Sequence, residues 1–132
     1  MSVVISTSAL TKTYDMGATK VHALRGVDVS ISENDYVALM GPSGSGKSTL
    51  LRMLAGLQDC DGEVRFGEQL WQTDEVKLPP WERPLGMMFQ EPTLFRHLSV
   101  RGNLDYVVKR RGAAGDLDSV VSQTRIEGLL GR

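Results

Sequence analysis

Eight consecutive residues, Gly41-Pro-Ser-Gly-Ser-Gly-Lys47-Ser48, have the types and the spacing needed to hold a phosphate group. They fit the pattern G-x-x-x-x-G-K-[ST] at every fixed position. The glycines allow successive backbone N–H groups to approach phosphate oxygens, which a Cβ would obstruct. Lys47 would reach the β- and γ-phosphates as a point charge, and the hydroxyl of Ser48 would ligate Mg²⁺. The candidate cofactor-binding residues of this loop are Gly41, Pro42, Ser43, Gly44, Ser45, Gly46, Lys47, Ser48 and Thr49.

The segments on either side of the loop are those that such a site requires. Residues 36–40 (Tyr-Val-Ala-Leu-Met) are predicted to form a short buried strand, and residues 48–55 are predicted to form a helix that begins just behind the loop. The amino end of that helix would add its unpaired N–H groups and its positive dipole end. The alternative is a surface loop rich in glycine and serine with an incidental lysine.

The remaining pattern predicts an α/β fold. Strands are expected over 3–14 and 21–31, joined by a turn at 15–18, and a short hairpin over 63–66 and 69–71 turns at Gly67. Residues 86–89 are a further apolar strand candidate. Helices are expected over 99–111, with Ser99 as the cap, and over 116–130, with residues 112–115 as the linker. Together these elements indicate a nucleotide-binding unit with a small antiparallel β layer in front.

Composition narrows the possible partners. A chain of 132 residues with 41% hydrophobic and 23% charged residues is typical of one globular domain, and the net charge of −1 gives no support for a nucleic-acid surface. Cys60 is the single cysteine, which excludes an internal disulfide, and His22 and His97 have no metal-site spacing. No apolar run is long enough to cross a bilayer and no signal peptide is evident, so we expect no direct membrane insertion.

The run GMMFQEPTLFRHLSVRGNL over residues 86–104, together with Tyr14, the loop and Gly62, resembles the first half of an ATP-binding-cassette (ABC) ATPase, the motor subunit of ABC transporters. The resemblance covers most of the chain and is nearest to the molybdate- and sulfate-type importer branch. It implies a P-loop NTPase fold of the ABC type, incomplete, with an N-terminal antiparallel β layer and a partial parallel core sheet. Residues 1–132 would be one partial nucleotide-binding domain.

The resemblance also implies roles for particular residues. ATP and Mg²⁺ would be the cofactors, and Tyr14 would stack on adenine, although a strand-end tyrosine that covers the core is the alternative. Lys47 and Gln90 would be the catalytic residues, with Ser48 and Gln90 at the metal, although an ordinary loop glutamine at a strand end is the alternative for Gln90. The region Gln90–Asn103 would contact a transmembrane permease subunit, and Phe95 and Leu98 are either anchors of that contact or plain core residues. A second ATPase subunit and a cytoplasmic, peripheral location at the inner face of the plasma membrane follow from the same resemblance.

The sequence also departs from the family. Asn34-Asp35 stand where Gly-Glu is usual, and asparagine is the next best residue for a left-handed turn. No apolar strand followed by Asp-Glu is present, and the Leu-Ser-Gly-Gly-Gln motif and the switch histidine are also missing. We therefore expect the N-terminal part of such an ATPase, marginal in stability and without ATP turnover by itself, because hydrolysis needs those carboxylates.

Three functions remain open on the sequence. The first is the ATP-binding part of a transport-coupling subunit, most simply an importer. The second is another phosphate-loop enzyme such as a small-molecule kinase; a GTPase should show Asn-Lys-x-Asp, which is absent. The third is a nucleotide-binding fragment that does not hydrolyse ATP.

Overall fold

The computed structural model describes residues 2–111 and 116–132. The chain divides into two compact units, Met1–Met87 and Met88–Arg132, and each is described by itself. The expected linker at 112–115 lies outside the described residues. Within the described ranges, no helix has both the length and the apolar character needed to span a membrane.

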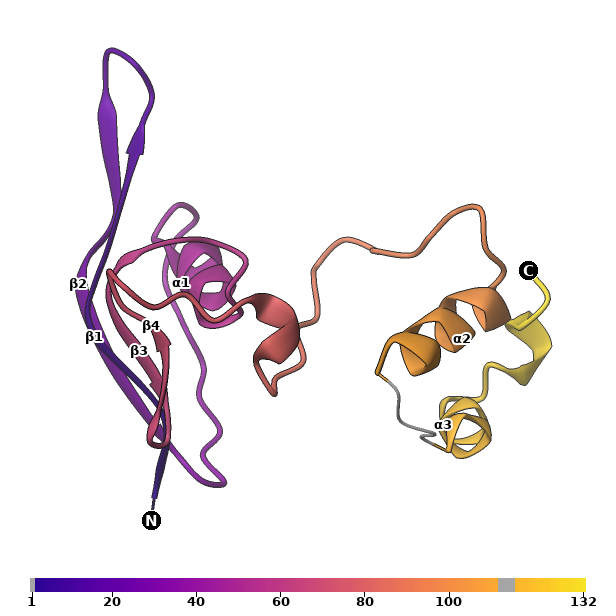
Figure 1. Cartoon of the computed structure of the whole chain (residues 1–132). Helices are drawn as coiled ribbons and strands as arrows, with labels where there is room; N and C mark the ends of the chain where they lie inside the picture. Colours follow the sequence, from indigo (N-terminus) through magenta and orange to yellow (C-terminus); the bar gives the residue numbers. More distant parts are fainter. Residues whose placement is uncertain (1, 112–115) are drawn as a thin grey trace. The chain divides into compact units, whose positions relative to one another are not determined.

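The first unit is built on an antiparallel sheet of strands β1 (Val3–Asp15), β2 (Lys20–Ser32), β3 (Asp61–Phe66) and β4 (Gln69–Gln72), in the order β2-β1-β3-β4. Figure 1 shows β1 and β2 as a long hairpin. Its register runs from Val3 opposite Ser32 to Asp15 opposite Lys20. The strands predicted from alternation are therefore confirmed, as is the short hairpin at 63–71.

One helix, α1 (Lys47–Leu54), covers the sheet and closes the core of this unit. The helix presents Leu50, Met53 and Leu54 to the strands because these positions share one face at helical spacing. Trp71 of β4 is fully buried beside them and stacks on Phe66 with ring centroids 4.8 Å apart. The buried core consists of Leu10, Leu24, Leu50, Met53, Leu54, Cys60, Val64 and Trp71. This packing fixes the helix, and with it the loop at the amino end of the helix, against β1 and β2.

Two predicted strands are wrong. Residues 36–40 and 86–89 have no strand geometry, so the described residues contain no parallel core sheet. Tyr36 and Met40 are 107% and 90% exposed, and Met88 is 95% exposed. An apolar run becomes a strand only when a neighbouring strand supplies its hydrogen bonds, and no described strand pairs with either run. The turn before residues 36–40 is as predicted, since Asn34 has a left-handed φ of 65°.

The second unit consists of α2 (Val100–Arg111), α3 (Leu117–Thr124) and a short 3₁₀ helix, η2 (Glu127–Leu129). The hydroxyl of Ser99 accepts a hydrogen bond from the Gly102 N–H at 3.1 Å, so the predicted cap is confirmed. The single helix predicted over 116–130 is wrong at its end. It stops at Thr124 because Arg125 takes a left-handed φ of 55°, which is a common helix termination.

Candidate functional site

The loop at residues 41–48 is held against β2 by a close backbone approach. Gly46 is the residue before α1, with a φ of 90°, and its carbonyl oxygen accepts the first helical hydrogen bond from Leu50 at 2.9 Å. A Cβ at Gly46 would lie 2.5 Å from the carbonyl oxygen of Ala23 in β2. Only glycine satisfies both the left-handed backbone and this contact. The glycine therefore sets the distance between the loop and the strand.

Lys47 folds back over the loop. Its Nζ donates hydrogen bonds to the carbonyl oxygens of Gly41 and Pro42 at 2.6 and 2.8 Å and to the Ser45 hydroxyl at 3.0 Å. The loop thereby holds a full positive charge above its own backbone. A bound anion would meet this charge together with the loop N–H groups.

A cavity of about 400 Å³ joins the loop to the end of the long hairpin. It brings Tyr14 of β1 together with the loop, although Ser43, the first loop residue that lines the cavity, is 29 positions further along the chain. The lining residues are Tyr14, Val21, His22, Ala23, Ser43, Gly44, Ser45, Gly46, Lys47, Ser48 and Thr49. The predicted loop residues from 43 to 49 therefore share one cavity with the predicted aromatic, while Gly41 and Pro42 contribute through their contacts with Lys47.

The amino end of α1 suits a phosphate chemically. No side chain caps its first N–H groups, and no acidic residue lies in its first turn to repel an anion. The Ser48 hydroxyl lines the same cavity. In the described parts of the chain no three acidic, histidine or cysteine side chains gather to hold a metal. A single hydroxyl suits Mg²⁺, which is usually held by few protein ligands together with phosphate oxygens and water.

His22 was missed as a pocket residue by the sequence analysis. Its Nδ1 lies 2.9 Å from the Thr13 hydroxyl oxygen, its partner across the hairpin, and its ring borders the cavity. The register of the hairpin, which places His22 opposite Thr13, the residue before Tyr14, was the signal that could have found it.

Gln90 and the region Gln90–Asn103 belong to the second unit. Asn103 organises this region: its Oδ1 accepts the Phe95 N–H at 2.8 Å, and its Nδ2 donates to the carbonyl oxygens of Phe95 and Ser99 at 3.1 and 3.0 Å. The Phe95 ring packs edge-on against Tyr106, with centroids 4.7 Å apart, yet remains 42% exposed. A buried amide thus holds a loop that presents an aromatic ring to solvent, and Asn103 is a residue whose part the sequence alone did not reveal.

Comparison with known proteins identifies the family of the chain. The family model described as ABC transporter matches residues 24–132. The chain is 43% identical over 109 residues to the sn-glycerol-3-phosphate import ATP-binding protein UgpC of Burkholderia lata, covering 82% of this chain and 28% of that protein. It is 46% identical over 110 residues to the molybdenum import ATP-binding protein ModC of Thiobacillus denitrificans, covering 80% of this chain and 30% of that protein. The chain thus spans about a third of the length of the curated relatives it matches.

Solved structures give the same result for the fold. A dimeric structure of MJ0796, a bacterial ABC transporter cassette, superposes with a TM-score of 0.77 at 29% identity, over 97% of this chain and 60% of that one. A second structure of the same cassette, bound to ADP and Pi, gives a TM-score of 0.78 at 28% identity, with the same coverage of both chains. The predicted resemblance and the importer-type branch are confirmed by these relatives. On its phosphate loop, its fold and the family match over residues 24–132, the chain belongs to the ABC transporter family of ATP-binding proteins.

Proposed function

We propose that this chain is the ATP-binding part of an ABC transporter energy-coupling subunit, which powers solute import in the complete protein. The observation that carries the proposal is the cavity that unites Tyr14 with residues 43–49. The Tyr14 ring offers a flat π-face for adenine, and the loop offers N–H groups and a lysine for the phosphates. The import names of the relatives support the direction of transport.

Mg²⁺ supplies charge neutralisation between the phosphates when it is bound. Ser48 is the residue of the first unit that would ligate it, and Gln90 is assigned to the same metal by its motif alone. When ATP binds, Lys47 Nζ exchanges its hydrogen bonds to the loop carbonyl oxygens for hydrogen bonds to phosphate oxygens. The new bonds are stronger because phosphate oxygens carry a greater negative charge.

The partner surface in this proposal is the region Gln90–Asn103. The half-exposed Phe95, together with Leu94 at 64% exposure, supplies the apolar contact that a permease helix would cover. Such a contact would hold the protein at the inner face of the membrane. A second ATPase subunit completes the assembly, as the dimeric form of the matched cassette supports.

The test is thermal unfolding of the 132-residue chain with and without MgATP. Ligand that binds only the native state should stabilise it by about 2.7 kcal/mol at a hundredfold excess over Kd. Lys47→Ala should abolish the shift. Lys20→Ala, which removes an exposed lysine from the same unit, is the matched control and should keep the shift. An equal MgATP response in the parent chain and in Lys47→Ala would refute the assigned site.

A further inference from the structure

The phenol of Tyr14 is held from outside the nucleotide cavity. Gln58 Nε2 donates a hydrogen bond to the Tyr14 hydroxyl oxygen. Gln58 lies in the loop after α1 and is 44 residues away along the chain. A tyrosine ring fixed only at its Cβ can rotate about two side-chain torsions, so a bond at the hydroxyl end restricts where the ring face points.

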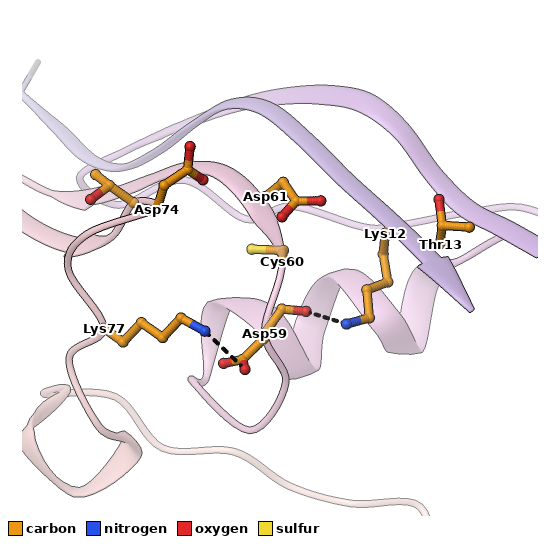
Figure 2. Close-up of a pocket in the computed structure, with 8 residues that line it drawn as sticks. Lys12, Thr13, Asp59, Cys60, Asp61, Asp74 and Lys77 are labelled. Atoms are coloured by element: carbon orange, nitrogen blue, oxygen red, sulfur yellow. Dashed lines mark hydrogen bonds and ion pairs between the residues drawn. The ribbon is translucent and has the colours of Figure 1, made fainter. Parts of the chain in front are cut away.

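The loop that carries Gln58 is itself anchored. Figure 2 shows Lys12 and Lys77 converging on the next residue, Asp59. Lys12 Nζ donates to the Asp59 carbonyl oxygen at 2.8 Å, and Lys77 Nζ lies 3.0 Å from the Asp59 carboxylate. Lys77 and Asp59 are more than half exposed, so their ion pair adds little to the free energy of unfolding. Its effect is to restrict the position of the loop. The loop is therefore tied to β1 on one side and to the segment after β4 on the other.

Lys12 also contacts the ring that Gln58 holds. Its Nζ lies 5.7 Å from the centroid of the Tyr14 ring, within the range of a cation–π contact. Lys12 lines the neighbouring cavity of about 340 Å³ shown in Figure 2, and the nucleotide cavity has a separate lining that includes Tyr14. The ring is thus contacted by two side chains, Gln58 and Lys12, that do not line the cavity the nucleotide would enter.

We propose that Gln58 is a positioning residue for base recognition: it orients the Tyr14 ring toward the cavity, so that the site prefers nucleoside triphosphates to phosphate chains without a base. This inference rests on the proposed function. Gln58 is outside the lining of the nucleotide cavity and reaches the ligand only through Tyr14. Its loss should therefore weaken the contribution of the base and leave phosphate binding by the loop intact.

The experiment compares MgATP with magnesium tripolyphosphate, which has no base, by titration calorimetry on the full 132-residue chain. Gln58→Met keeps the side-chain length and removes the hydrogen bond. It should raise the Kd for MgATP by about three- to tenfold, the equivalent of one hydrogen bond, and leave tripolyphosphate binding within about twofold. Tyr14→Phe breaks the same bond and keeps the ring. The double variant should bind MgATP no more weakly than the weaker of the two single variants, because both substitutions remove the same hydrogen bond.

Gln123→Met is the matched control, because the Gln123 amide bonds to Ser119 within α3, at 2.9 Å. It should leave both affinities unchanged. Equal weakening of both ligands by Gln58→Met would assign Gln58 to the loop structure and overturn the proposal, as would additive losses in the double variant. A parent chain that binds both ligands equally would keep the phosphate site and overturn the base-positioning role. A parent that binds neither would overturn the proposed function and this inference together.

Discussion

Nη1 of Arg83 lies 2.8 Å from the carbonyl oxygen of Met53, at the carboxyl end of α1. The same nitrogen donates to the Leu54 carbonyl at 2.8 Å, and Nε donates to Leu78 at 3.0 Å. Arg83 is only 4% exposed, and burial lowers the pKa of its guanidinium, which nevertheless stays charged at neutral pH. A cation at this end complements the helix dipole. The carboxyl end of α1, the helix that follows the 41–48 loop, is therefore capped by a side chain from a distant segment.

Replacing Arg83 should destabilise the first unit strongly. We expect Arg83→Met to lower the free energy of unfolding by about 3 kcal/mol, because several carbonyl oxygens each lose one hydrogen-bond donor, among them that of Leu54. Arg52→Met, which changes an exposed arginine in the last turn of α1, should cost less than about 0.5 kcal/mol. Urea unfolding measures both, and equal effects of the two substitutions would contradict the assigned role of Arg83.

Gly46→Ala should damage the loop more than a glycine change elsewhere. The added Cβ would meet the Ala23 carbonyl oxygen at 2.5 Å, in a left-handed backbone that alanine resists. We expect a loss of about 2 kcal/mol in the free energy of unfolding and loss of the MgATP-induced shift. Gly86→Ala is the control, since nothing lies within 4 Å of its Cβ position. Thermal melts of both variants, with and without MgATP, measure the loss of stability and the MgATP-induced shift. Equal behaviour of the two variants would contradict the prediction.

Alkaline pH should destabilise the first unit through Cys60. Burial raises the pKa of this thiol above its ordinary value of 9.0, and the side chain is 7% exposed. The unfolded chain therefore loses the proton at a lower pH than the folded one. The stabilising contribution of the protonated Cys60 thiol is complete below about pH 9 and is lost as pH rises through the folded-state pKa. Cys60→Ala should flatten this decline relative to the parent in urea titrations from pH 7 to pH 10.5, and identical slopes would exclude the thiol as its source.

Residues 36–40 should drive self-association. Tyr36 and Met40 are almost fully exposed in a segment of strand-forming residues that has no strand partner among the described elements. The double substitution Tyr36→Lys/Met40→Glu should reduce the fraction of large species in sedimentation velocity while leaving the unfolding midpoint unchanged. Met16→Lys, at a residue 71% exposed in the turn between β1 and β2, should have no such effect.

The 132-residue chain should bind MgATP without steady turnover. No apolar strand followed by Asp-Glu occurs in its sequence, and phosphoryl transfer to water needs carboxylates that hold the metal and orient the nucleophile. Phosphate release should therefore equal that of Lys47→Ala. Sustained release by the pure parent chain, lost in the variant, would disprove this expectation.

Local sequence was enough wherever an element depends on its own residues. The backbone of the glycine-rich loop, α1 and the two hairpins were predicted because glycine positions, helical spacing and strand alternation act over a few neighbouring residues. The strands at 36–40 and 86–89 were predicted by the same rules and are wrong, since a buried strand depends on partners that an apolar run does not encode. The prediction that the last helix continues to residue 130 is wrong for a similar reason, because hydrophobic periodicity does not reveal the single left-handed residue, Arg125, after which α3 ends at Thr124.

The sequence by itself thus determined the family and the glycine-rich loop at residues 41–48, because a motif of fixed spacing encodes its own backbone geometry. Only the tertiary structure decided that Tyr14 shares a cavity with that loop, that Gln58 holds the Tyr14 hydroxyl and that Arg83 closes α1. These contacts join residues that lie tens of positions apart. They arise from the packing of α1 on the sheet, which no local pattern specifies.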